Sequence, residues 1–266
     1  MVFRRLWGDK GGIPLEMDTV ILSDPVEPGG MLTGEVVLRA PDRDVEVQSI
    51  HLEAFVDTPG VHKDDGDESK GPSFTSTAAS GWFTLKKGEE RRSPFRQRLW
   101  WGSPVSEVNG QRFHGVSLTL HTKVEAEGIS TRTDSDPLRI AALPLHTAVF
   151  DAFTAEGYGC TTSRIVDSTI PDTEYSIYLR QSFLLTRQSG HEGPQELELT
   201  FHNNSVGCEI YLRRAALHKR HWDDKPPALR YVAAHHDVGR VDFTEEVRRW
   251  IGEVAALGQS HEGAAD

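Results

Sequence analysis

The amino-acid sequence predicts an all-β protein with a minor helical part, arranged as two β-sandwich lobes followed by a C-terminal helix. The first observation is that apolar and polar residues alternate with a period of two in many short segments. The second is that turn-forming residues separate these segments, as at 28–30, 87–89 and 109–110. The third is that helical spacing of apolar residues appears near the middle of the chain and again near its end. Short strands with frequent turns are typical of a sandwich.

The first half of the chain carries the clearest strand patterns. We predict strands over residues 33–39 and 45–57. Within the second of these, the apolar residues change parity near Ser49, which indicates a bulge or a crossing from one sheet to another. The further strands predicted in this half cover residues 81–86, 92–99, 116–124 and 138–143. Residues 57–73 are strongly polar, and we expect a hairpin loop there rather than a calcium site.

A second lobe is predicted after Leu143, so we expect one lobe over residues 1–143 and another over 144–258. Residues 146–156 have the apolar spacing of a helix. Strand alternation then returns in the segments 175–179, 197–201, 208–212 and 229–238.

The end of the second lobe has the signals of a helix. Asp242 is followed three residues later by Glu245, which is a capping box with Asp at the cap position. The apolar residues that share one face of this helix are Phe243, Val247, Trp250, Ile251 and Val254. We expect the helix to pack its Trp250 face onto the second sheet and residues 259–266 to form a disordered tail.

Charge and composition exclude several classes of function. The chain has 29 Lys and Arg against 40 Asp and Glu, a formal charge of −11. A general nucleic-acid binder needs a basic surface to displace counterions, so we predict no nucleic-acid partner. No apolar run approaches the roughly 18 residues that span a bilayer, and no apolar segment follows the charged start, so we predict a cytoplasmic protein. Phe3, Leu6 and Trp7 are expected to pack on the first lobe, with a weak membrane contact through residues 1–7 as the alternative.

The residues of the first half also resemble a known family. The stretches that carry the resemblance are 17–22, 26–38, 47–52, 83–89, 93–95, 118–124 and 134–138. In these stretches, and in the helix–strands–helix order of the second half, the chain resembles the sporulation-control (SpoOM) family of bacterial proteins. The chain departs from that family's pattern at 210–214, where an Asp is missing, and at Trp100–Trp101. The resemblance implies two arrestin-like β-sandwich lobes plus a C-terminal helix, and a role in the control of sporulation or development.

No motif of the sequence points to catalysis. The chain has neither a Gly-x-Ser-x-Gly elbow nor a Gly-rich phosphate loop before a helix, and Cys160 and Cys208 lie in no metal-binding spacing. We therefore predict a non-enzymatic protein without a cofactor. The alternative is a metal-dependent hydrolase in which His235 and Asp237 share a strand face, with His218 and His221 nearby. Solvent-side histidines are favoured, because the spacing fixes no third ligand.

Basic residues gather in one short segment of this acidic chain. In residues 91–99 the alternation places Phe95 on one face and Arg92, Arg96 and Arg98 on the other. We call these three residues the arginine stripe. Guanidinium groups bind carboxylate and phosphate oxygens in a fork, so the arginine stripe is a candidate protein-interaction site. The competing interpretation is that the arginines pair with local acids or stay solvated.

Two further groups of residues are candidates. Arg132, Asp134, Asp136 and Arg139 precede the predicted lobe boundary and could form a buried charge cluster between the lobes, although solvated strand ends are favoured. Trp82, Trp100 and Trp101 suggest a carbohydrate-binding sandwich as a weaker alternative.

Together these observations predict a regulatory or adaptor protein that acts through protein–protein contacts. The contacts would use sheet edges, the arginine stripe and movement between the lobes, since edge strands expose unpaired backbone groups. The sequence leaves the identity of the partner and the oligomeric state open.

Overall fold

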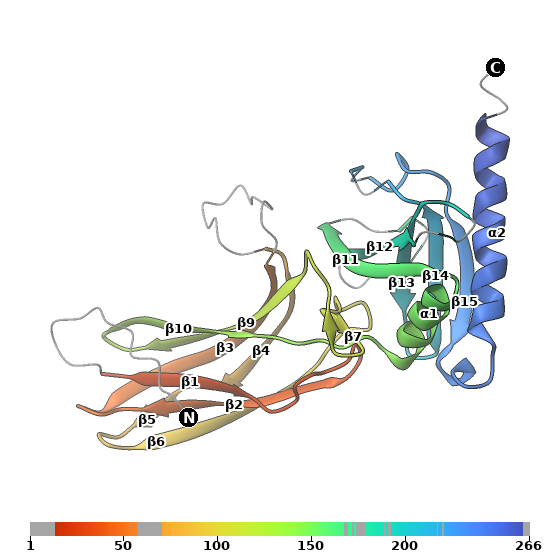
Figure 1. Cartoon of the computed structure of the whole chain (residues 1–266). Coiled ribbons are helices and arrows are strands. Elements are labelled where there is room, and N and C mark those ends of the chain that lie inside the picture. The colour runs from red at the N-terminus through yellow and green to blue at the C-terminus, as the bar shows by residue number, and fades with distance from the viewer. Residues whose placement is uncertain are drawn as a thin grey trace. The chain divides into compact units, whose positions relative to one another are not determined.

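In the computed structural model, the described residues are 14–57, 71–167, 170–171, 173, 179–188, 190, 193–216, 218–219 and 221–262. They form mostly β-strands, together with the helices α1 (Pro144–Ala155) and α2 (Phe243–Glu262) (Figure 1). The predicted all-β fold with a minor helical part and a C-terminal helix is confirmed. Contacts divide the chain into two compact units. Unit 1 takes its described residues from 1–26, 30–99 and 117–139, and unit 2 from 27–29, 100–116 and 140–266.

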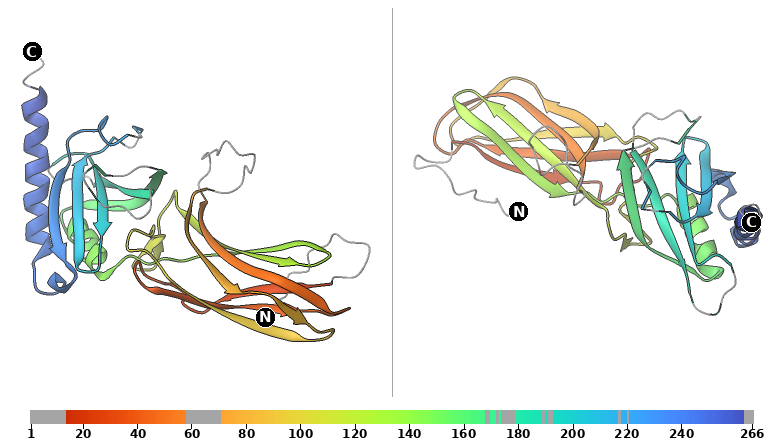
Figure 2. Two further views of the ribbon diagram at one scale, coloured as in Figure 1. Left: turned by 180° about the vertical axis from the view of Figure 1, so that it is seen from behind. Right: turned by 90° about the horizontal axis from the view of Figure 1, so that it is seen from above.

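Unit 1 is a sandwich of two antiparallel sheets (Figure 2). One sheet has the strand order β1 (Glu16–Ile21), β2 (Met31–Arg39) and β6 (Glu90–Arg98). The other has the order β10 (Ile129–Pro137), β9 (Ser117–Ala126), β3 (Val45–Asp57) and β4 (Ser73–Ser80), and β5 (Phe83–Leu85) also pairs with β3. The alternating apolar side chains of both sheets form the core, including Leu32, Val36, Ile50, Leu52 and Val124, which are all buried.

The long strand β3 contains the parity change that the sequence predicts. Its register against β9 shifts between Val47 and Ser49, which is a β-bulge within one sheet rather than a crossing between sheets. The two sheets are joined by a buried hydrogen bond of 2.7 Å between the hydroxyls of Thr19 and Thr122. Gly34 of β2 has no room for a side chain, because an added Cβ would lie 2.4 Å from the ring of Phe95.

Unit 2 is a five-stranded antiparallel sheet with α1 on one face (Figure 1). The strand order is β11 (Tyr158–Asp167), β12 (Leu179–Arg187), β13 (Glu196–Asn203), β14 (Gly207–Arg214) and β15 (Leu229–Ala234). Phe150 of α1 contacts the rings of Phe183 and Phe201 at centroid distances of 5.2 and 5.6 Å. A small hairpin of β7 (Glu107–Val108) and β8 (Gln111–Arg112) belongs to this unit.

The terminal helix packs as the sequence predicts. Asp242 accepts hydrogen bonds from the backbone N–H groups of Thr244 and Glu245 at 2.9 and 3.3 Å. Trp250 is buried and stacks on Tyr231 of β15 with ring centroids 4.5 Å apart. The helix continues to Glu262, so the tail predicted to be disordered begins too early. Residues 263–266 lie outside the described residues.

Two predicted strands differ from the structure. The strand predicted over 138–143 is wrong, since Ala141 forms only an isolated bridge with Glu107. The strand predicted over 229–238 ends at Ala234, and His235–Asp237 form a 3-10 helix. The Asp237 carboxylate accepts the Ala234 N–H at 2.7 Å, and this local bond competes with the strand ladder.

The division into units also differs from the single boundary predicted at Leu143. Residues 100–116 belong to unit 2, although residues 117–139, which follow them, return to unit 1. The physical reason is that Phe113 packs on the rings of Phe150 and Phe183 in unit 2, at 5.8 and 5.1 Å. The predictions for residues 1–7, for 58–70 of the polar insertion, and for positions 175 and 177 fall outside the described residues.

Candidate functional site

The arginine stripe lies on β6, with the face assignment that the alternation predicts. Phe95 and Leu99 are buried, whereas Arg92, Arg96 and Arg98 are exposed. In the register with β2, Arg96 stands opposite Thr33 and Arg98 opposite Met31. The three guanidinium groups therefore lie along the outer face of unit 1's three-stranded sheet.

Arg92 of the arginine stripe is paired with acidic side chains of its own sheet. Arg92 donates hydrogen bonds to Glu35 at 2.5 Å and to Glu90 at 3.2 Å. The pKa of Arg92 is raised above its ordinary value. The main cause is the hydrogen bond to Glu35, and the negative charge of Glu35 is the second cause. Within the part of the chain that the structure describes, the exposed side chain of Arg96 has no hydrogen bond or ion pair. The competing interpretation therefore fits both Arg92, which pairs with local acids, and the exposed Arg96. The role of the arginine stripe in protein interaction stays a prediction.

Strand β6 is the edge strand of its sheet, and β4 of the other sheet lies close to it. Among the described strands, only β2 pairs with it. The N–H of Leu99 binds Gly30 O at 2.9 Å, and Glu89 O accepts the N–H of Ala40 at 3.2 Å. Odd-numbered residues therefore bond to β2, while the arginine stripe directs its backbone groups outward. Pro94 lies on the same outward side, where its missing N–H breaks no ladder bond.

Two of the charged residues near the predicted boundary contact β1 and the segment that follows β1. Asp134 of β10 accepts the backbone N–H of Thr19 at 3.0 Å, and Arg139 lies 3.7 Å from the carboxylate of Asp24. Both contacts lie within unit 1: the first ties β10 to β1, and the second ties the residues just after β10 to the segment after β1. A role of Arg132, Asp134, Asp136 and Arg139 between lobes stays a prediction.

The geometry assumed for a metal site at His235 and Asp237 is wrong. Both residues lie in the 3-10 helix, not on a strand. His235 donates from Nε2 to Asn204 O at 2.9 Å and stacks on Trp101, while Asp237 caps Ala234. In the described residues, no three His, Cys, Asp or Glu side chains come together as a metal site would require.

The tryptophans of the carbohydrate alternative lie in different units. Trp82 in unit 1 is 69% exposed, and Trp100 in unit 2 is 49% exposed. Trp101 also belongs to unit 2, where its ring stacks on His235. The carbohydrate-binding alternative stays a prediction.

Unit 2 contains a buried group of charges that the sequence analysis missed. Glu198 of β13 accepts hydrogen bonds from Lys225 at 2.6 and 2.7 Å and from Ser182 at 2.8 Å. Arg180 lies 3.7 Å from Glu198, and Arg213 stands opposite it in the register of β14. We call Arg180, Glu198, Arg213 and Lys225 the cationic cluster; all four are buried. Burial alone would raise the pKa of Glu198, but the hydrogen bonds from Lys225 and Ser182 hold it below its ordinary value.

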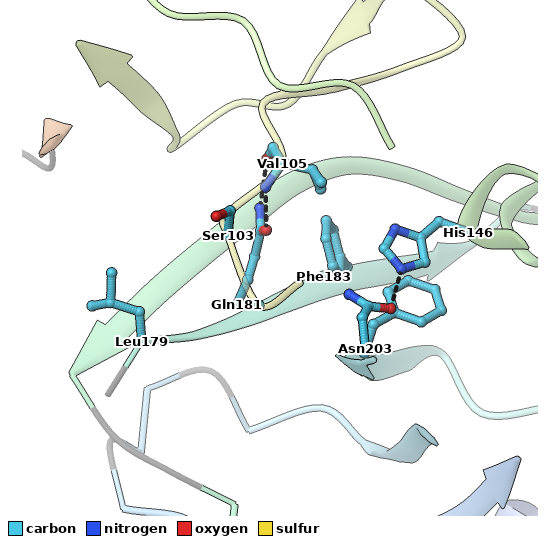
Figure 3. A pocket seen from close by; sticks show the side chains of 9 residues that line it. Ser103, Val105, His146, Leu179, Gln181, Phe183 and Asn203 are labelled. Carbon is cyan, nitrogen blue, oxygen red and sulfur yellow. Dashed lines mark hydrogen bonds between the residues drawn. The ribbon is translucent and has the colours of Figure 1, made fainter. Parts of the chain in front are cut away.

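The opposite face of the same sheet holds a small cavity (Figure 3). His146 of α1 donates from Nε2 to the side-chain oxygen of Asn203 at 2.6 Å and stacks on Phe201. Burial lowers the pKa of His146 to about 4, so the imidazole is neutral at pH 7. The amide of Gln181 binds both backbone groups of Val105 and holds residues 100–105 against β12. These contacts attach α1 and residues 100–105 to the sheet of unit 2.

Comparison with known proteins gives consistent results. A family model described as SpoOM protein matches residues 3–215. The Sporulation-control protein spo0M of Bacillus subtilis (strain 168) is 24% identical over 258 residues, which cover 95% of this chain and 96% of that protein. The crystal structure of Spo0M, sporulation control protein, from Bacillus subtilis matches with a TM-score of 0.74 at 20% identity, covering 91% of this chain and 99% of that one. This structural likeness shows the fold.

Proposed function

Because the chain belongs to the SpoOM protein family, we propose that it is a regulatory protein that acts in the control of sporulation through contacts with partner proteins. The observation that carries the proposal is the match of the family model over residues 3–215. We propose that it works in the cytoplasm; the described part contains no helix long and apolar enough to cross a membrane.

The proposal assigns the protein no chemistry of its own. Burial raises the pKa of the Cys160 thiol to about 12 and raises the pKa of Cys208 as well, so neither is a thiolate at neutral pH. His146 is buried and hydrogen-bonded to Asn203, and burial keeps its imidazole neutral at pH 7. These features support a binding role without a cofactor.

The partner contact that the geometry supports best is at β6, the edge strand of its sheet. There Arg96 and Arg98 have exposed side chains on one face, and Arg96 directs its backbone N–H and C=O groups away from β2. An extended partner segment with Asp or Glu at every second position satisfies both sets of groups. Pro94 lacks an N–H and limits this pairing to the C-terminal part of β6.

Affinity purification from the native host tests the contact. A partner that binds the wild-type chain should be lost with the double variant Arg96→Ala/Arg98→Ala and kept with Arg39→Ala, an exposed arginine on β2 of the same sheet. Equal recovery by the double variant would reject the arginine stripe as the contact. The regulatory role itself is tested separately, because deleting the protein should change the timing or yield of sporulation in the host.

A proline substitution distinguishes strand addition from a contact of side chains alone. Arg96→Pro removes an outward N–H but no bond to β2, so it should weaken partner binding more than Arg96→Ala does. Equal binding by the two variants would leave only the side chains as the contact. Gln97→Pro serves as the control for ladder damage, because Gln97 bonds to β2 and its loss should lower the melting temperature.

A further inference from the structure

The cationic cluster lies on the face of unit 2's sheet that is opposite α1. On β13, Leu197 and Leu199 point toward the helical side, so Glu198 between them points to the other face. Arg213 is its partner across β14, and Arg180 precedes Ser182, which hydrogen-bonds Glu198. Lys225 comes from the connection between β14 and β15, residues 215–228. The cluster is therefore assembled by three neighbouring strands and one covering segment.

The cluster carries more positive than negative charge. Its three cations are 0%, 2% and 8% exposed, and Glu198 is the carboxylate buried among them in the described residues. Burial lowers the pKa of Arg213 to about 10 and also lowers that of Lys225, despite the opposing effect of Glu198. Both shifts mean that the loss of hydration and the repulsion between the cations outweigh the effect of Glu198, to which the charge of Asp223 adds at Arg213. An added anion would restore the balance.

The guanidinium group of Arg213 in the cationic cluster also has a hydrogen-bond donor that the described residues leave unused. Nη1 of Arg213 donates to the carbonyl oxygens of Trp222 and Pro226 at 3.2 and 3.1 Å. Its Nη2 is buried and has no hydrogen-bond partner in the described residues. Buried donors without a partner are rare in native proteins, and one common explanation is an ion or water that belongs there.

The cover over the cluster contains no helix or strand in its described residues. The ring centroid of Trp222 lies 3.5 Å from the guanidinium carbon of Arg213 and 4.9 Å from the guanidinium carbon of Arg180. Two kinds of hydrogen bond hold this covering segment in place. Lys225 donates to Glu198, and Arg213 donates to the carbonyl oxygens of Trp222 and Pro226. A segment held by a few side-chain bonds can shift to admit a small ligand more readily than a paired strand can.

We propose that the cationic cluster is a binding site for a phosphate-type oxyanion, held by Arg213, Arg180 and Lys225 beneath residues 215–228. Guanidinium groups bind such oxygens in a planar fork and an ammonium adds a point charge, which are the donors that the cluster supplies. The site is separate from β6 and independent of the proposed function.

Thermal unfolding of the full chain tests the site. At equal ionic strength and pH, the melting temperature should rise with inorganic phosphate over chloride and then saturate. Arg213→Met should remove this rise, and Lys225→Met should reduce the affinity by roughly tenfold. Arg230→Met, an exposed arginine on β15, should leave it intact. No saturable rise in the wild type, or an equal rise in Arg213→Met, would overturn the proposal.

Two further measurements cover folding failure and the source of the ligand. If Arg213→Met does not fold, line broadening of the ³¹P signal of inorganic phosphate should still appear with wild type and weaken with Lys225→Met; its absence with wild type refutes the site. A phosphoserine peptide should compete for the signal if the ligand is a phosphorylated side chain. If only inorganic phosphate binds, the ligand is the free ion.

Discussion

The molecule has two groups of arginines in opposite environments. Those of β6 in unit 1 are exposed and make at most surface ion pairs, such as Arg92 with Glu35. Those of the cationic cluster in unit 2 are buried beneath residues 215–228 and share one buried carboxylate. The difference teaches that the same side chain is a candidate for recognition in one unit, whereas in the other it is a buried charge that depends on its carboxylate partner. Substitutions in the two groups should therefore affect different measurements.

The largest effect is expected from Glu198→Gln. The change leaves three buried cations without their carboxylate, and breaking a buried pair in this way destabilises by about 3–5 kcal/mol. Urea unfolding in chloride buffer measures the loss. Glu209→Gln is the matched control, because Glu209 pairs with exposed Arg230 and should lose no more than about 1 kcal/mol. Equal losses in the two variants would contradict the distinction between buried and surface pairs.

A pH effect of nearly the same size is expected from His146. Its pKa is about 4 in the folded protein against an ordinary 6.5, so the unfolded chain binds the extra proton first as pH falls. The free energy of unfolding should decrease by about 3 kcal/mol between pH 6.5 and 4 and show no further loss from this residue below that range. His146→Gln should flatten this part of the profile. A slope that the substitution leaves unchanged would assign the effect to other groups.

An intermediate effect is expected at the start of α2. Asp242→Ala removes the acceptor for the N–H groups of Thr244 and Glu245 and should lower stability by about 1 kcal/mol. Glu245→Ala keeps the cap and should change less. If both variants unfold at the same denaturant concentration, the cap contributes nothing measurable.

The smallest effect on stability is expected in the arginine stripe. Arg96→Ala/Arg98→Ala should change the free energy of unfolding by less than about 0.5 kcal/mol, because both side chains are exposed. Partner binding should nevertheless fall. A large stability loss here would show that the stripe belongs to the fold rather than to a recognition surface.

Periodicity predicted the elements whose buried and exposed residues differ sharply in polarity. Strands β2, β3, β6, β9, β13 and β14 and both helices follow such patterns. Strands β1, β4, β10, β11 and most of β12 were not predicted. For β4 and β10 the reason is that their sequences, SFTSTAAS and ISTRTDSDP, are small or polar at most positions. Their pairing with β3 and β9 is supplied by neighbours far along the chain.

Of the candidate sites, the arginine stripe could be located from the sequence, and the cationic cluster could not. Alternation in β6 suffices to place three arginines opposite Phe95. Alternation in β13 likewise places Glu198 opposite Leu197 and Leu199, and that polar position within an apolar strand was the available signal. The alternation in β13 does not indicate that Lys225 and Trp222, from a later part of the chain, lie over that face.

The sequence by itself determined the alternation of the strands, the cap and apolar face of α2, and the family resemblance, because each depends on residues close together in the chain. The tertiary structure alone decided that residues 100–116 belong to unit 2 and which arginines are buried. The physical reason is that alternation selects a face of a strand, whereas burial depends on what lies over that face. In unit 2 the covering segment comes from a different part of the chain, and its position follows from packing and charge rather than from any local pattern.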